Sequence, residues 1–237
     1  MFTLALLLAL HTTPADEQAR GTTTLPVSAS AAEQCPQFHE GTKVVRVERC
    51  DVVDSGELAV VEGDRYSYRL YCIDVAGAPV PVCAEARGSR GVAVFVRRQG
   101  ETRLRPVTTS FVISGEIRRP SIVANRYGHI LELPTVVSAT CECNASRYFL
   151  KRSSSRDWRE LDFDKWQTEL GPHLPAGVAS MNAPWPDLAN MRVGGALWRR
   201  DDAHCCPAGG TFSGELAIEG NRFVLRSVQV NPANEKP

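Results

Sequence analysis

The feature of this sequence that most constrains its fold is a succession of short, strand-like runs. Lys43–Val47 and Leu58–Val61 are rich in β-branched residues, and apolar and polar side chains alternate from Tyr66 to Cys72. Alternation with a period of two is the pattern of a strand that buries one face. Comparable runs recur at 91–96, 111–113, 129–133, 147–150, 158–161, 215–218 and 222–230. We therefore predict a mainly β fold built from antiparallel sheets.

Helical patterns are confined to one small region. Asp164–Leu170 fits a short helix, which Gly171-Pro172 would end. Pro186–Leu197 carries three apolar residues at roughly helical spacing and begins with a proline, a favourable first helical residue, and Gly194-Gly195 would end this helix early. The sequence thus predicts an α+β arrangement with a small helical insert near 164–197.

The predicted domain organisation follows from where the strand-like runs begin and stop. Residues 16–34 are small and polar, with almost nothing to bury, and are expected to be a flexible linker. We place a boundary near Arg118-Arg119-Pro120. It separates a predicted N-terminal β subdomain (35–117) from a C-terminal β-rich subdomain (118–230). The predicted disordered tail is 231–237.

The composition excludes several classes of protein. The 237 residues include 27 Lys plus Arg and 27 Asp plus Glu, which gives a formal net charge of zero. Because nucleic-acid-binding domains are usually strongly basic, no nucleic-acid partner is expected. The hydrophobic share of 43% and the charged share of 23% are those of a globular protein. After the N-terminal segment, no apolar run approaches the length of about 18 residues that spans a bilayer, so no membrane span is expected.

The N-terminal segment predicts export. Phe2–Leu10 is an apolar run of nine residues, too short to cross a bilayer but suited to the hydrophobic region of a signal peptide. Thr13-Pro14-Ala15 offers a cleavage site with small residues, although no Lys or Arg precedes the run. We predict a signal peptide over 1–15 and a periplasmic or secreted protein; a buried N-terminal strand or helix is the alternative.

The eight cysteines fit an oxidising compartment, where disulfides persist. Eight cysteines allow 105 pairings, so spacing alone does not fix the connectivity. Cys72 ends a strand-like run and Cys83 follows across a Pro-containing connection, which favours a bridge between them. By the same argument Cys35 pairs with Cys50. We expect disulfides to staple the sheets.

The remaining four cysteines lie in two unusual segments, and three interpretations stay open. Cys141 and Cys143 would share one side of a strand, while Cys205 and Cys206 are adjacent and follow His204. In the structural interpretation, Cys205 and Cys206 pair with Cys141 and Cys143. In the second interpretation, these thiols and His204 hold zinc or a softer metal. In the third, a strained disulfide within either pair is redox-active.

Recognised catalytic motifs are absent from the sequence. There is no HExxH, P-loop or GxGxxG segment, and Gly88-Ser89-Arg90-Gly91 is not a nucleophile elbow. Two acidic pairs, Asp162 with Asp164 and Asp201 with Asp202, could act as acid and base in an envelope hydrolase. Such clusters beside Arg and Trp are more often helix caps and surface ion pairs. We expect a non-catalytic protein without a cofactor.

The C-terminal half resembles a group of exported bacterial proteins of unassigned activity that carry a Trp…Asp-Ala-x-Cys-Cys-Pro-x-Gly-Gly segment. The match covers about residues 118–230, and its most specific piece is Cys205–Gly210. The other matching residues are Leu131–Pro134, Arg147–Phe149, Trp158–Trp166, Leu174–Gly177, Leu197-Trp198, Asp202–His204 and Asn221–Val228. The resemblance implies export and a β-rich fold, and it carries over no catalytic residue.

The residues expected to bind a ligand are two tryptophans and two arginines. Trp185 and Trp198 would supply a large contact area. Arg118 and Arg119 close a stretch from Arg97 that has an excess of positive charge and could face an anionic polymer. We predict a disulfide-stabilised binding or structural protein of the bacterial envelope, whose partner is an envelope protein or an anionic envelope polymer. The alternatives are a thiol-dependent metal or redox protein and an envelope hydrolase.

Overall fold

The computed structural model describes residues 35–40, 43–76, 90–112, 115–137, 143–153, 155–180, 184–203 and 205–233. The predicted signal peptide and linker lie outside these ranges, as do Cys83, Cys141 and His204. Within them the fold is mainly β, with antiparallel strand pairing in every sheet, as the sequence predicts. The last strand runs through Pro232, which is two residues into the predicted disordered tail.

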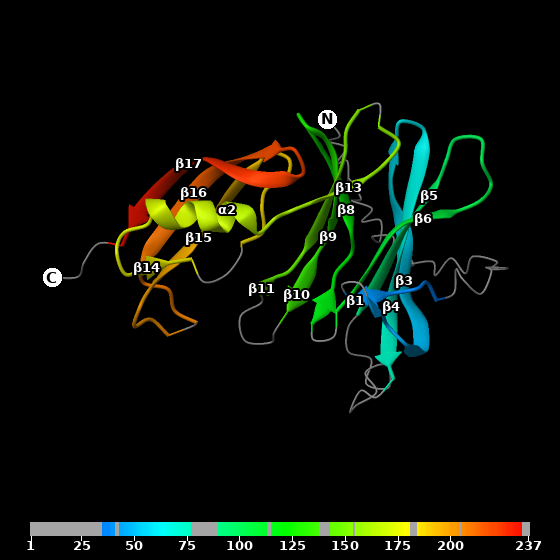
Figure 1. The fold of residues 1–237 in the computed structure, drawn as a ribbon, viewed down its shortest axis with the longest axis horizontal. Helices are drawn as coiled ribbons and strands as arrows, with labels where there is room; N and C mark the ends of the chain where they lie inside the picture. The colour runs from blue at the N-terminus through cyan, green and yellow to red at the C-terminus, as the bar shows by residue number, and fades with distance from the viewer. Residues whose placement is uncertain are drawn as a thin grey trace, which may run out of the picture.

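Three four-stranded sheets form successive layers (Figure 1). The first sheet has the order β3–β4–β5–β6, with strands Val47–Val61, Asp64–Val75, Gly91–Arg97 and Arg105–Phe111. The middle sheet has the order β13–β12–β9–β8, with strands Arg159–Leu161, Arg147–Lys151, Gly128–Leu133 and Ser121–Asn125. The third has the order β14–β15–β16–β17, with strands Val178–Ala179, Arg192–Arg199, Gly210–Glu219 and Arg222–Pro232.

Smaller elements complete these layers. A three-stranded sheet has the order β11–β10–β7, with strands Cys143–Asn144, Thr135–Val137 and Glu116–Ile117. Strands β1 (His39–Glu40) and β2 (Lys43–Val44) form a two-stranded pair. Helix α2 (Lys165–Leu170) continues into the 3₁₀ turn η2 (Gly171–His173), and both lie within the predicted helical insert.

The second predicted helix, Pro186–Leu197, is wrong. The segment forms a turn followed by strand β15, and Met191 adopts a left-handed backbone with φ 54°. At Gly194 a Cβ atom would lie 2.9 Å from the carbonyl oxygen of Phe212 on β16, so the glycine permits close pairing of the two strands. The apolar spacing that resembled a helix therefore serves a turn and a buried strand.

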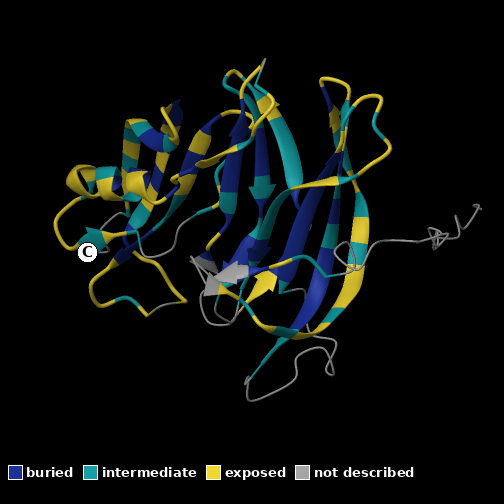
Figure 2. Cartoon of the chain, turned by 45° about the vertical axis from the view of Figure 1, so that its right-hand side comes forward, coloured by how far each residue is buried: buried dark blue, intermediate teal, exposed yellow. Residues whose placement is uncertain are grey.

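Both faces of the middle sheet are buried. Leu131 and Phe149 point to the first sheet and pack in a cluster with its residues, including Val94. The neighbouring residues in these strands, Ile130 and Tyr148, point the other way and pack against helix α2 and the third sheet. Figure 2 shows buried residues, in dark blue, along the strands of the facing sheets. The middle sheet therefore belongs to two hydrophobic cores at once.

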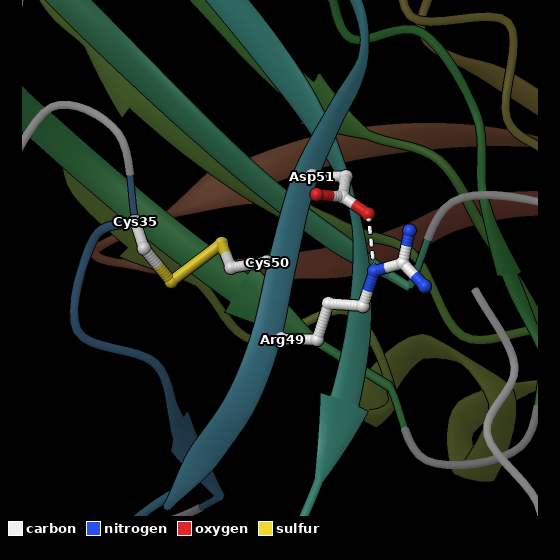
Figure 3. Close-up of a disulfide and its surroundings, with 4 residues drawn as sticks. All are labelled: Cys35, Arg49, Cys50 and Asp51. Carbon is white, nitrogen blue, oxygen red and sulfur yellow. Dashed lines mark hydrogen bonds and ion pairs between the residues drawn. A yellow bond between two sulfur atoms is a disulfide. The ribbon is translucent and has the colours of Figure 1, made fainter. Parts of the chain in front are cut away.

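A disulfide fastens the N-terminal segment across the outer face of the first sheet. Cys35 and Cys50 form the predicted bridge, with their Cα atoms 5.8 Å apart (Figure 3). Beneath the segment, Phe38 is fully buried and packs against Ile73 in a third hydrophobic cluster. On the exposed side of β3, Arg49 and Asp51 form an ion pair at 2.6 Å. The bridge thus holds in place the N-terminal segment that covers this third hydrophobic cluster.

The other predicted disulfides have different outcomes. Cys72 is disulfide-bonded, whereas its expected partner Cys83 lies outside the described residues. Cys205 and Cys206 are free thiols, so the disulfides predicted for them are not formed in this structure. Both lie in the exposed loop between β15 and β16. The sequence alone does not show how far this loop lies from the other cysteines.

Candidate functional site

Four turns gather at one end of the layers, at the top of Figure 1. They connect β3 to β4, β5 to β6, β12 to β13, and β16 to β17. In the first of these turns, Glu62 and Gly63 both have positive φ, 52° and 88°. This conformation gives the tight turn that matches the twist of a hairpin. Turns presented by a rigid sheet scaffold are the usual carriers of binding residues, so this end of the molecule is a candidate binding surface.

Polar contacts join these turns to one another. The backbone N–H of Gln99 donates to the carboxylate of Asp64 at 3.0 Å, which ties the β5–β6 turn to strand β4. The ammonium of Lys151 on β12 pairs with the carboxylate of Glu62. Arg152 donates from Nη2 to the carbonyl oxygen of Gly220 at 3.1 Å. The four turns therefore form one connected surface.

The first cleft of this surface, here called the lysine cleft, has a volume of about 460 Å³. Its key residue is Lys151, whose side chain is only 3% exposed. A buried ammonium is strongly destabilising unless it is paired, and Glu62 provides that pairing. The lining residues are Glu62, Asp64, Arg98, Gln99, Glu101, Lys151, Ser155 and Arg156.

The adjoining cleft, here called the tryptophan cleft, has a volume of about 200 Å³. Tyr66 and Trp158 meet edge to face, with ring centroids 5.5 Å apart, and join the first sheet to the middle sheet. Burial raises the pKa of Tyr66 above its ordinary value, because the charged phenolate is poorly solvated there. The lining residues are Asp64, Tyr66, Val96, Arg98, Arg105, Pro106, Val107, Arg156, Asp157 and Trp158.

On the other side of the β12–β13 hairpin lies the largest of the three clefts, here called the leucine cleft, of about 720 Å³. Leu150 and Leu161 belong to the core shared with the third sheet, and both line this cleft. The turn between β16 and β17 forms its other wall. The lining residues are Leu150, Arg152, Ser155, Asp157, Arg159, Glu160, Leu161, Gly220 and Asn221.

Most acidic side chains that line these clefts already have partners. Glu101 pairs with Arg105 at 2.9 Å. Glu160 pairs with Arg147 at 2.7 Å. Glu62 pairs with Lys151, as described above. Among the described residues, only Asp157 combines a place in the clefts with a carboxylate that makes no hydrogen bond or ion pair.

Unlike the acidic side chains, most arginines of the clefts have no ion-pair partner among the described residues. Within the part of the chain that the structure describes, Arg98, Arg156 and Arg159 form no ion pair. Arg152 contacts a carbonyl oxygen and no carboxylate. The joined lysine and tryptophan clefts hold four basic and four acidic side chains, so their net charge is zero. Arg98 and Arg156 nevertheless have no ion-pair partner in the described part of the chain and can pair with a ligand. This arrangement can receive an anionic ligand.

The four residues predicted to bind a ligand line none of the three clefts. Arg119 is 74% exposed and pairs with Asp54 of the first sheet at 2.7 Å. Arg118 is exposed. Trp198 lies on β15 in the third sheet and is buried, so it offers little surface. Trp185 is 37% exposed.

The Cys205–Cys206 loop is a braced turn with exposed thiols. The carboxylate of Asp202 accepts hydrogen bonds from the backbone N–H groups of Arg199 and Ala208, each at 2.7 Å. A hydrogen bond with Cys205 and the charge of that neighbour raise the pKa of the Cys206 thiol. A raised pKa reduces the share of reactive thiolate. No group of three or more His, Cys, Asp or Glu that could hold a metal occurs in the described ranges, which omit Cys141 and His204.

The acidic pairs proposed for hydrolysis have local structural contacts. Asp162 accepts a hydrogen bond from the backbone N–H of Asp164 at 3.1 Å, at the start of α2. Asp202 braces the cysteine loop, as described above. One carboxylate of each pair, Asp162 or Asp202, thus follows the more common role of acids in turns.

A separate polar row crosses the middle sheet on the side of the third sheet. The hydroxyl of Ser121 donates to Glu132 at 3.2 Å, and Asn144 donates to the buried hydroxyl of Tyr148 at 3.2 Å. Burial raises the pKa of Glu132, with hydrogen bonds from Ser121 and Tyr148 acting in the opposite direction. These groups satisfy one another inside the core and line none of the three clefts.

Comparison with protein-family models, with curated protein sequences and with solved structures found no match. No helix long and apolar enough to cross a membrane occurs among the described residues. The contacts and charges of this chain therefore carry the functional argument.

Proposed function

We propose that this chain is an exported, disulfide-stabilised binding protein of the bacterial envelope, without catalytic activity of its own. Its ligand is an anionic envelope polymer, and its binding site is the joined lysine and tryptophan clefts. The observation that carries the proposal is that Arg98 and Arg156 line both of these clefts with no acidic partner among the described residues.

The chemistry of these side chains supports an anionic ligand. A guanidinium group presents a planar set of N–H donors that matches the two oxygens of a carboxylate. Arg98 comes from the β5 end of the first sheet, and Arg156 comes from the β12–β13 hairpin of the middle sheet. Because the Tyr66–Trp158 contact joins these two sheets, the two arginines are presented by a fixed scaffold. The aromatic rings add contact area beside the charged groups.

The test is binding of polygalacturonate, a soluble polymer of uronic acid, to the purified mature chain at low and high salt. We expect saturable binding that weakens as salt rises. The double variant Arg98→Gln, Arg156→Gln is expected to bind about tenfold more weakly, because two charge-assisted hydrogen-bonding groups are lost. Circular dichroism and thermal unfolding of each variant check that the fold is retained.

The matched control is Arg118→Gln, Arg119→Gln, which removes the same number of charges from arginines outside the clefts. We expect this variant to bind within about twofold of wild type, since exposed charges at a distance are screened by salt. Equal losses in both double variants would mean that only net charge matters, and that result would refute the site. Failure of wild type to bind any polyanion at low salt would refute the function.

Export is supported by the apolar run at Phe2–Leu10 and by the resemblance described in the sequence analysis. Intact mass of the protein recovered outside the cytoplasm tests it. We expect a product that begins near Asp16. A product that still starts at Met1 would contradict the signal peptide.

Thiol chemistry at Cys205 and Cys206 is a second candidate function, because both thiols are free, adjacent and exposed. In this alternative they act with Cys141, Cys143 and His204 to bind a metal or exchange electrons. Thiol counting in the folded, exported protein distinguishes the candidates. Two or more reactive thiols together with retained metal would favour this alternative. Complete pairing of all eight cysteines would exclude the metal site. A redox role would then require a disulfide within Cys141–Cys143 or Cys205–Cys206, which disulfide mapping tests.

A further inference from the structure

The three clefts share lining residues in the turn of the β12–β13 hairpin. Ser155 lines both the leucine cleft and the lysine cleft, and Asp157 lines both the leucine cleft and the tryptophan cleft. The same turn is therefore a wall of each cleft. A ligand longer than one cleft can pass over this turn and contact the protein on both sides of the middle sheet.

Both sides of the hairpin carry arginines without acidic partners among the described residues. Arg98 and Arg156 line the clefts on the side of the first sheet. Arg152 and Arg159 line the leucine cleft on the side of the third sheet. Two separated pairs of guanidinium groups suit a ligand that carries anionic groups at intervals along a chain.

Asp157 lies between these two pairs, and its carboxylate has no partner in the part of the chain that the structure describes. A ligand carboxylate placed beside Asp157 would be repelled. Hydroxyl groups, by contrast, would donate to it. Leu150 and Leu161 also line the leucine cleft, but each is only 4% exposed and adds little contact area. The carboxylate of Asp157 therefore favours an acidic polysaccharide over an acidic polypeptide.

Resting on the proposed function, we propose that one linear acidic polysaccharide chain crosses the β12–β13 hairpin and engages both arginine pairs at once. The joined lysine and tryptophan clefts hold one part of the chain, and the leucine cleft holds another. Linking two weak sites through one ligand raises the effective concentration at the second site, so affinity depends on chain length.

The test compares oligogalacturonates too short to reach both sides of the hairpin with oligomers of increasing length. In wild type, we expect affinity to rise steeply, by about a hundredfold, once the oligomer reaches both sides. The double variants Arg98→Gln, Arg156→Gln and Arg152→Gln, Arg159→Gln should each lose this gain while keeping weak binding of short oligomers. The control Arg118→Gln, Arg119→Gln should keep the full gain.

The outcomes separate this inference from the proposed function. If wild type binds short and long oligomers equally, or if Arg152→Gln, Arg159→Gln keeps the gain, the crossing path is wrong and the single-cleft function stands. If no oligomer of any length binds, the proposed function itself fails. If polyglutamate displaces the long oligosaccharide and shows the same length dependence, the ligand class is wrong.

Discussion

Shortening a side chain on either face of the middle sheet should destabilise the whole molecule, because that sheet serves two cores. Leu131 and Ile130 are adjacent on β9, both fully buried, and point to opposite faces. Replacing a buried Leu or Ile by Ala costs about 2–5 kcal/mol through lost burial and the cavity left behind. We expect Leu131→Ala and Ile130→Ala each to fall within this range.

The assay is denaturant unfolding followed by far-UV circular dichroism and by tryptophan fluorescence. For a chain of this size, a loss of about 3 kcal/mol lowers Tm by roughly 6–12 °C. Because the chain has Trp158 beside the first sheet and Trp166 in α2, fluorescence responds to both cores. The expected result is one shared transition for each variant, with both probes coincident.

The control is Val53→Ala, at a side chain that is 54% exposed on β3 and should change stability by no more than about 0.5 kcal/mol. The reasoning would be refuted if Ile130→Ala unfolded in two separate steps, with the first sheet retained after the third had melted. Such a result would mean that the two cores are independent and that the middle sheet does not couple them.

Three further predictions concern other parts of the structure. Replacing both Cys35 and Cys50 by Ser should lower the free energy of unfolding by about 3 kcal/mol, because the bridge closes a loop with a sequence separation of 15; denaturant titration measures this. The pKa of Glu132 is raised above its ordinary value of 4.5, so the native state keeps a proton that the unfolded chain releases. Stability should therefore fall as pH rises from 4.5 through the folded-state pKa, and Glu132→Gln should lack this component in pH-dependent unfolding. Asp202→Ala should speed amide exchange at Ala208, which donates to that carboxylate, with little change in Tm; unchanged exchange would contradict the bracing role.

The β class could be predicted because it depends on local alternation, which the strand from Tyr66 to Cys72 shows directly. The disulfide between Cys35 and Cys50 could also be predicted from the sequence, since it closes a short loop. The helix predicted over Pro186–Leu197 failed because spacing alone does not distinguish a helix from a turn followed by a strand. Two glycines in that segment were the available signal against a stable helix.

The candidate site was only partly visible in the sequence. The basic stretch that begins at Arg97 does contain Arg98, which lines the site. Arg156 and Lys151 come from a hairpin in the middle sheet, and only strand pairing and sheet packing bring them beside the first sheet. Arg119 was selected for its local charge, yet the fold pairs it with Asp54. Long-range packing therefore decides which arginines stay free.

The strand order has a consequence for how the chain is made. Each of the three main sheets is drawn from one continuous stretch of sequence, in the order first, middle and third. A chain that emerges from its N-terminus can therefore complete the first two layers before β16 and β17 exist. Until they arrive, the face that holds Ile130 and Tyr148 has no cover from the third sheet. An aggregation-prone stage is thus expected late in synthesis, before β16 and β17 are available to cover this face.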